Sequence, residues 1–229
     1  MKKVICFFPV LLLFISLEVF AVFDLLTSFS LEEGARVYKE RCVLCHGQNG
    51  GDEGLIPASL FYLEKPNLLE PKYSTDEYSL RNIIIWGGMK NKMSIFSPPW
   101  GNDLTWGEVE SLIIFIMHMR EKNNHAVKLL NNIIVTKKLD IKAGQLIYNK
   151  RCAICHGITG NGKGRIAEAM KAPKPINLIQ SKLSDVDLKK IISKGGISVS
   201  RSSGMPPWKN ELSSIELDSV IKYIKTFRE

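Results

Sequence analysis

The feature that most constrains this chain is a short run of residues that occurs twice. The run RCVLCHG at residues 41–47 recurs as RCAICHG at residues 151–157, 110 positions further on. Both copies have the pattern C-x-x-C-H, in which two thiols lie within one turn of chain and an imidazole follows directly. A chain that contains this unit twice is expected to fold as two similar halves, each built around one copy.

The C-x-x-C pattern serves several kinds of chemistry, and spacing separates them. It occurs in zinc sites, in thiol–disulfide redox sites and in plain disulfides. A zinc ribbon has about 15–20 residues between its two pairs, whereas 106 residues lie between Cys45 and Cys152 here. The following histidine is typical of c-type haem, whose vinyl groups take the two thiols and whose iron takes the imidazole. We therefore predict two covalently bound haem c groups with their iron. The attachment residues are Cys42, Cys45, Cys152 and Cys155, and the proximal ligands are His46 and His156.

The N-terminus has the composition of an export signal. Two lysines precede an apolar run that ends near Ala21, so a signal peptide is predicted over residues 1–21. The alternative is an uncleaved anchor, because Val4 to Phe23 spans 20 mostly apolar residues, the length that a transmembrane helix needs. Pro9 and Glu18 argue against the anchor. In both cases we expect the body of the chain to be exported, to the periplasm or an equivalent compartment.

Cysteine usage and charge limit the partners. Cys6 lies inside the N-terminal segment and is interpreted as one more apolar residue, so the other four cysteines all belong to the two repeated runs. No thiol remains for a structural disulfide or a cysteine nucleophile. The net charge of +8 favours redox partners that are acidic or bound to a membrane. Nucleic acid is excluded as a partner by the compartment, and membrane association through the N-terminus is expected if the segment is retained.

The repeat extends well beyond the two runs. Capping signals at Ser30 and Asp140 predict a first helix over residues 31–40 and its copy over 140–151, and those at Thr105 and Ser213 predict a last helix in each half. Strand periodicity is absent. The composition, 45% hydrophobic and 24% charged, is that of ordinary globular domains. We therefore predict an all-α fold. Its two domains are expected at residues 30–120 and 139–229, with a linker at 121–138 that packs partly on one of them.

The second half contains a clear candidate for the ligand opposite the histidine. Met205 lies in the loop sequence GMPPW, 49 residues after His156. A methionine usually fills a core, but this one stands among Ser, Gly and Pro. Since His/Met ligation is known for haem iron in cytochromes, we predict Met205 as the sixth ligand.

The first half differs at this position. When the two halves are aligned on Pro-Pro-Trp, Ser97 stands in the place of Met205. We predict Met93 as the ligand, 47 residues after His46, with Met89 or an open site as alternatives. His118 is interpreted as a residue of the last helix that lies on its surface or packs, and His125 as a solvated linker residue.

Both halves resemble class I (mitochondrial-type) cytochrome c domains joined in tandem. The resemblance rests on C-x-x-C-H, on Gly34 and Tyr38 with their copies Gly144 and Tyr148, on Met-Pro in the second half and on the aromatic last helices. It implies an all-α fold whose first and last helices cross near a haem edge, His/Met iron and one-electron transfer. It also implies a proline carbonyl at the proximal histidine. Pro57 suits this role in the first half, whereas Ala167 stands at the matching place in the second, so that either Pro173 or Pro175 substitutes or the feature is lost.

The leading hypothesis is an exported dihaem electron carrier, or the electron-transfer subunit of a larger oxidoreductase or respiratory chain, rather than a stand-alone catalyst. The choice of the distal ligand decides between electron transfer and chemistry on a substrate. The alternative is therefore a dihaem enzyme, a peroxidase or a sulfur-compound oxidoreductase, with an open or exchangeable site at the first haem. The oligomeric state does not follow from the sequence.

Overall fold

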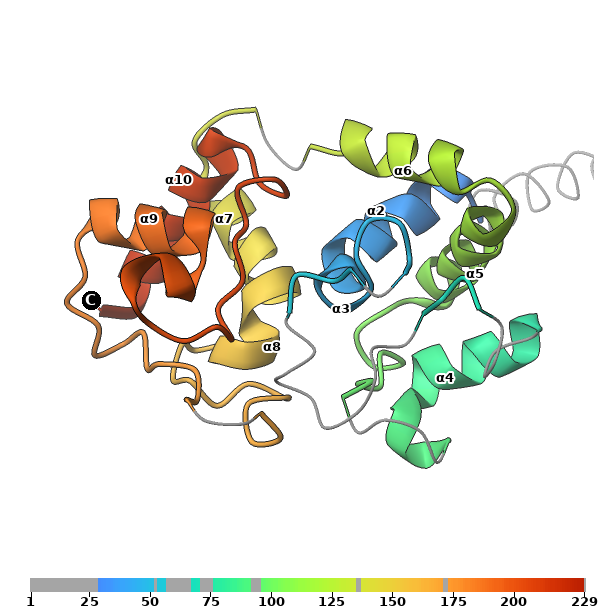
Figure 1. Ribbon diagram of the computed structural model, residues 1–229, viewed down its shortest axis with the longest axis horizontal. Helices are drawn as coiled ribbons and strands as arrows, with labels where there is room; N and C mark the ends of the chain where they lie inside the picture. Colours follow the sequence, from blue (N-terminus) through green and yellow to red (C-terminus); the bar gives the residue numbers. More distant parts are fainter. Residues whose placement is uncertain are drawn as a thin grey trace, which may run out of the picture.

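The computed structural model describes residues 29–51, 53–56, 67–70, 76–91, 96–134, 137–170 and 173–228. Within these ranges the chain forms helices and turns and no strand, which confirms the all-α fold class. The helices gather into two bundles, one formed by α2 to α6 and one by α7 to α10 (Figure 1). The predicted signal peptide and Cys6 lie outside the described residues. No helix in the described ranges is both long enough and apolar enough to cross a bilayer.

Among the described residues, the first bundle contains the helices α2 (Leu31–Arg41), α3 (Val43–His46), α4 (Glu77–Lys90), α5 (Trp106–Glu121) and α6 (Asn123–Asn132). The second bundle repeats this order without a counterpart of α6. It contains α7 (Ile141–Ile147), the π-helical turn η2 (Tyr148–Cys152), α8 (Ala153–His156), α9 (Asp185–Lys194), the 3-10 turn η3 (Gly196–Val199), α10 (Ser214–Lys225) and the 3-10 turn η4 (Thr226–Arg228). Each bundle has its own apolar core.

The predicted capping residues begin the helices. Ser30 accepts a hydrogen bond from the amide of Glu33 at 3.0 Å, and Asp140 accepts one from Lys142 at 2.8 Å. Thr105 and Ser213 each form the full capping box, which satisfies amides that have no partner within the helix. Polar side chains that the sequence places before apolar runs therefore fix the start of the first and last helix of each bundle.

One helix end differs from its prediction. The helix predicted over residues 140–151 is α-helical only to Ile147, and a π-helical turn then carries the chain to Cys152. In the first bundle, α4 continues beyond its glycine pair to Lys90. It does so across a break at Gly87, whose φ of +74° only glycine adopts readily.

The first and last helices of each bundle cross at a glycine. A Cβ on Gly34 would lie 2.0 Å from the carbonyl oxygen of Ser111, and one on Gly144 would lie 2.0 Å from that of Ser219. The backbones therefore meet without a side chain between them. The predicted packing of first on last helix, with glycine at the contact, is confirmed in both bundles.

The segment interpreted as a linker contains a helix that the sequence did not predict. Helix α6 packs on α2 and α5, where Ala126 and Leu130 are fully buried. Lys39 donates to the carbonyls of Leu130 at 2.7 Å and Ile133 at 3.1 Å. A cation thus satisfies the last carbonyls of α6, where the helix dipole favours positive charge, and fixes this helix to the first bundle.

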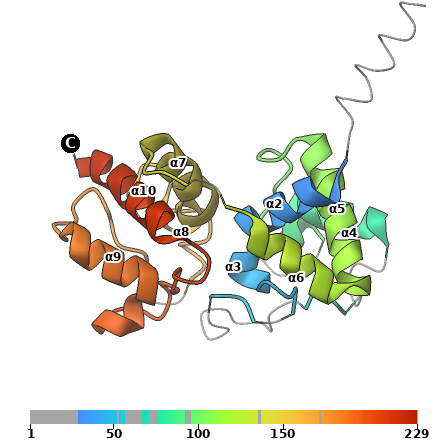
Figure 2. The same ribbon diagram turned by 90° about the horizontal axis from the view of Figure 1, so that it is seen from above.

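Polar contacts join the two bundles. Lys150 forms an ion pair with the buried carboxylate of Glu40, and Gln48 donates to Glu211 at 2.6 Å. On the same interface Trp100 lies between two guanidinium groups, with the carbon of Arg41 at 5.3 Å and that of Arg165 at 5.4 Å from its ring centroid. The attachment turns α3 and α8 therefore stay close to one another (Figures 1 and 2).

Candidate haem sites

The second C-x-x-C-H run forms a compact turn at the end of a helix. Cys152 ends η2, and α8 then presents Cys155 and His156 before the chain reverses at Gly157, whose φ is +78°. The hydroxyl of Tyr148 donates to the carbonyl of Gly157 at 2.7 Å and holds this reversal. Local structure thus fixes two thiols and an imidazole on one wall of the second bundle.

The imidazole of His156 has a backbone partner. Its Nδ1 lies 3.4 Å from the carbonyl oxygen of Ile176, so that Nε2 is free to bind a metal. Burial lowers the pKa of His156, although the contact with the carbonyl opposes this effect. The neutral form that ligates iron is therefore favoured. The carbonyl belongs to Ile176, which corrects the expectation that Pro173 or Pro175 would supply it.

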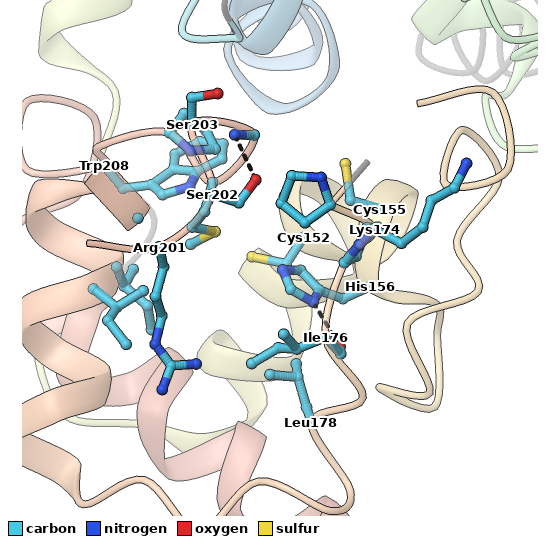
Figure 3. Close-up of a pocket in the computed structure, with 18 of the residues that line it drawn as sticks. Cys152, Cys155, His156, Lys174, Ile176, Leu178, Arg201, Ser202, Ser203 and Trp208 are labelled. Atoms are coloured by element: carbon cyan, nitrogen blue, oxygen red, sulfur yellow. Dashed lines mark hydrogen bonds between the residues drawn. The ribbon is translucent and has the colours of Figure 1, made fainter. Parts of the chain in front are cut away.

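A cavity of about 580 Å³ opens in front of this wall. Cys152, Cys155 and His156 line it on one side, and Met205 lines it as well. Figure 3 shows the sulfur of Cys152 and the ring of His156 beside the hollow, with Trp208 and Arg201 across it. Most of the remaining lining is aliphatic, with Leu178, Leu188, Ile192 and Ile224 among it.

These residues fit a covalently bound haem. The cavity lies within the range of cofactor pockets, and it combines unpaired thiols, an imidazole and a thioether with an apolar lining. Arg201 also lines the cavity and would hold the propionate carboxylates by charge-assisted hydrogen bonds. Lys174 instead donates to the carbonyls of Ala167, Glu168 and Met170. It therefore closes a turn of chain at the rim.

The thiols of the C-x-x-C pairs lie in environments that favour their protonated form. Burial raises the pKa of Cys42, Cys152 and Cys155 to about 12. Redox-active and metal-binding cysteines are thiolates, stabilised by a lowered pKa. In the part of the chain that the structure describes, no three potential metal-binding side chains of His, Cys, Asp or Glu come together. Both observations agree with thiols that form thioether bonds to the vinyl groups of haem.

The first attachment turn has the same geometry. Cys42 ends α2, and α3 carries Cys45 and His46 to Gly47, whose φ is +72°. The hydroxyl of Tyr38 donates to the carbonyl of Gly47 at 2.9 Å, as Tyr148 does in the second bundle. The wall that presents the thiols and the imidazole is therefore built in the same way twice.

The distal side of the first site departs from the second. The amide of Gly88 donates to the carbonyl of Ser97 at 2.9 Å, and the amide of Gly196 donates to that of Met205 at 2.8 Å. Ser97 thus stands where the alignment placed it. Met89 extends from the end of α4 with 75% of its surface exposed, which does not favour it as a ligand. Met93, the predicted ligand, and Pro57 lie outside the described residues.

The first attachment turn also contributes to the second site. Leu44, the residue before Cys45, and Ile56 both line the cavity in front of His156 and pack in the core of the second bundle. Cys45 packs against the same core. Because Leu44 is part of the turn that would hold the first haem, one side chain lies between the two haem sites.

Two repeated attachment turns in a tandem all-α fold define a dihaem c-type cytochrome. Residues 29–116 and residues 139–224 each match the family described as cytochrome c oxidase, cbb3-type, subunit III. The chain belongs to this family and carries two covalently bound haem c groups with iron. Among solved structures, the chain is similar to one in a reducing HAO-like protein complex of Kuenenia stuttgartiensis. That similarity covers 86% of this chain and 96% of the other, with 23% identity and a TM-score of 0.34.

Several site residues were not predicted from the sequence. Arg201 follows Ser200, whose φ of +56° is the one positive value of a non-glycine residue in the described chain, but no local pattern marks either residue. No sequence pattern distinguishes Leu44 and Ile56 from ordinary core residues. His118 and His125 were assigned separately, yet Nε2 of His118 lies 2.8 Å from Nδ1 of His125.

Proposed function

We propose that this electron-transfer cytochrome is an exported subunit that passes single electrons between redox partners within a larger oxidoreductase. The observation that carries the proposal is the cavity of the second bundle, which His156 and Met205 both line. Haem iron supplies one-electron chemistry when it is bound there. His/Met ligation of the mitochondrial type would leave no position on that iron for a substrate.

The chain's own residues support this role by excluding water. Met205 and Trp208 close one side of the cavity, and Leu44 and Ile56 close another from the first bundle. An apolar shell limits solvent access and stabilises the reduced, less charged state. Membership of the subunit III family of cbb3-type oxidases supports a membrane-bound respiratory oxidase as the larger assembly.

The proximity of the two attachment turns supports electron exchange within the chain. Leu44 belongs to the first turn and lines the second cavity, and ion pairs and hydrogen bonds join the bundles on either side of it. A fixed and short separation between two redox centres favours direct exchange. Electrons would enter at one haem and leave at the other.

A second candidate function has its own observation. Ser97 occupies the backbone position of Met205, and its hydroxyl supplies no thioether. If Met93 does not reach the first iron, that iron would keep an open or exchangeable site. A peroxidase or a sulfur-compound oxidoreductase would need such a site, and the second haem would then relay electrons to it.

The test is spectroscopy of both irons in the native protein and in two variants. We expect both native irons to be low-spin, each with a thioether-to-iron charge-transfer band. Met205→Ala should remove the band of the second haem, and Met93→Ala that of the first. A native first haem that is high-spin or that binds carbon monoxide readily would favour the enzyme. If Met93→Ala left both bands unchanged, another residue would be the first ligand.

Export is proposed on the composition of the N-terminal segment. The mass of the mature protein decides between cleavage near Ala21 and a retained anchor. A mass reduced by residues 1–21 would establish a signal peptide. A mass that includes them, with the protein in the membrane fraction, would establish the anchor.

A further inference from the structure

Helices α4 and α5 carry five exposed apolar side chains, three of them aromatic, and none of the equivalent residues in the second bundle is aromatic. We call this set the aromatic face: Tyr78, Trp86, Met89, Trp106 and Ile114. Each is an exposed large apolar side chain, from 41% for Ile114 to 75% for Met89. A contiguous exposed apolar surface on a folded domain is typical of an interaction site.

Helices α4 and α5, which carry these five side chains, are joined by side-chain contacts. Arg81 of α4 forms a bidentate ion pair with Glu110 of α5, at 2.5 and 2.8 Å. Its guanidinium also lies 5.6 Å from the ring centroid of Trp106. Trp106, Glu110 and Ile114 follow one another at intervals of four residues, and therefore lie on one side of α5. These contacts of Arg81 hold α4 and α5 together in the free protein.

The repeat provides an internal comparison. The ion pair of Arg81 and Glu110 recurs in the second bundle as Lys189 and Asp218, at 2.7 Å. Positions therefore correspond at an offset of 108 residues along both helices. At three of the five positions of the aromatic face, the second bundle has a polar residue: Lys194 for Trp86, Ser214 for Trp106 and Lys222 for Ile114. The fold does not require tryptophan at these places, because its second copy is built without it.

We propose that the aromatic face of the first bundle rests on the surface of a lipid bilayer. Tryptophan and tyrosine are enriched at membrane–water interfaces, where lysine side chains extend toward the headgroups. The Nζ of Lys90 lies 3.7 Å from the ring centroid of Trp86, so this pair combines an apolar ring with a cation that can reach lipid phosphate. A net charge of +8 adds attraction to anionic lipids.

The position of the N-terminal apolar stretch in the sequence also favours a bilayer as the partner of the aromatic face. The apolar stretch from Val4 to Phe23 precedes this bundle and not the second. The amide of Ser30 donates to the hydroxyl of Ser111 at 3.1 Å, so the described chain begins against α5. The few residues between Phe23 and Ser30 span at most roughly 25 Å when extended. A membrane that takes up the stretch would therefore lie close to α5.

The position of α4 suits a surface contact. Figures 1 and 2 show α4 on the side of the first bundle that faces away from the second bundle. A membrane in contact with α4 and α5 would leave the interface between the bundles uncovered. The second bundle would project into solution, where a redox partner can reach it.

The experiment is hydroxyl-radical footprinting of the full-length holoprotein, with and without vesicles of phosphatidylcholine and phosphatidylglycerol. This measures the solvent access of Tyr78, Trp86, Met89 and Trp106 directly, whatever the state of the N-terminus. We expect vesicles to reduce the labelling of all four severalfold. Labelling of the exposed Val186 and Ile197 in the second bundle should not change.

Two double variants test the assignment. Trp86→Lys with Trp106→Ser gives the first bundle the residues of the second, and vesicles should then no longer protect Tyr78 and Met89. If the N-terminal segment is absent from the mature protein, this variant should also bind vesicles roughly tenfold more weakly, from the lost apolar burial. The matched control, Val186→Ser with Ile197→Ser, should behave as wild type. Unchanged haem spectra in both variants establish that the fold is intact.

Two results would overturn the proposal. In the first, vesicles leave the labelling of Trp86 and Trp106 unchanged. In the second, these residues are protected without lipid and increasingly so with protein concentration, which would assign the face to a second copy of the chain. Neither result bears on the haem ligands, so the proposed electron-transfer function is tested separately.

Discussion

Ser97 in the first bundle and Met205 in the second occupy the same place in the fold. The carbonyl of each accepts a hydrogen bond from the second glycine of a pair, at 2.9 Å from Gly88 and at 2.8 Å from Gly196. The backbone arrangement at Met205, the predicted distal ligand, is therefore repeated at Ser97, where a hydroxyl stands in place of the thioether. The two candidate sites share the structure of their attachment turns and differ at this position.

This relationship predicts the effect of Ser97→Met. The new thioether would extend from the position that Met205 has in the second cavity, toward the first iron. In a Met93→Ala background, we expect Ser97→Met to restore a low-spin first haem and its charge-transfer band, measured by near-infrared absorption. The second haem, with Met205 unchanged, is the internal control. Failure to restore the band would show that the loop before Pro98 differs from its copy.

The glycines at the helix crossings predict a stability difference. A Cβ on Gly34 or Gly144 would overlap a backbone carbonyl at 2.0 Å, so the helices must separate. We expect Gly34→Ala or Gly144→Ala to lower the free energy of unfolding of its bundle by about 1–3 kcal/mol. Gly107 in α5 has no atom within 4 Å of such a Cβ. Gly107→Ala should therefore raise stability by about 0.4–1 kcal/mol. Thermal and denaturant unfolding of the holoproteins measures both, and equal effects at Gly34 and Gly107 would contradict the crossing geometry.

Features that depend on neighbouring residues were predicted correctly. The capping residues Ser30, Thr105 and Ser213 begin their helices, because a cap needs only a polar side chain and an amide three residues on. The all-α fold followed from capping signals and from the absence of strand periodicity, and the place of Ser97 followed from the alignment of the two halves. These predictions needed no knowledge of how distant segments meet.

The features that were missed depend on distant segments. Leu44 lines the second cavity because the two bundles pack together, and nothing near residue 44 signals this contact. Helix α6 is stabilised by Lys39, which lies some 90 positions earlier in the chain. The carbonyl at His156 comes from Ile176, since chain geometry and not residue type decides which carbonyl faces the ring. Contacts between distant segments, such as these three, therefore could not be predicted from the residues around each position.

Acid should destabilise the first bundle through Glu33 and Glu108, two of the three carboxylates that pair with Arg36. Hydrogen bonding from Arg36 lowers the pKa of Glu33. Burial raises the pKa of Glu108, but hydrogen bonds from Thr105 and Arg36 outweigh it, and the net shift is downward. A carboxyl with a lowered folded-state pKa contributes stability above its unfolded pKa, near 4.3, and loses it as the pH falls through the folded value. We expect the free energy of unfolding to fall below about pH 4.5.

The control for this pH dependence is Arg36→Met, which keeps the apolar stem and removes the charge. It should be less stable than wild type at neutral pH, and its stability should fall less steeply in acid, because the two carboxyls lose their lowered pKa. The pairs with Glu33 and Glu108 are partly exposed, so their share of the difference should be modest and should shrink in high salt. The pair of Arg36 with the buried Glu40 adds to the loss of stability at neutral pH. An Arg36→Met profile parallel to that of wild type would show that these carboxylates do not set the acid limit.

The last prediction uses the two residues between the attachment cysteines of the first run. Val43 is buried in the core of the first bundle, whereas Leu44 packs in the core of the second and lines its cavity. Leu44→Ala would admit solvent beside the second haem, which stabilises its oxidised state. We expect the reduction potential of that haem to fall by a few tens of millivolts, where about 59 mV is a tenfold change for one electron.

Val43→Ala is the matched control, because it shortens the neighbouring side chain of the same turn. It should destabilise the first bundle by roughly 2 kcal/mol and leave the potential of the second haem unchanged. Potentiometric titration that resolves the two haems measures both variants. If Leu44→Ala shifted only the first haem, the contact between the first attachment turn and the second cavity would not exist in solution. A shift of the second haem alone would show that the first turn shields its neighbour's iron from water.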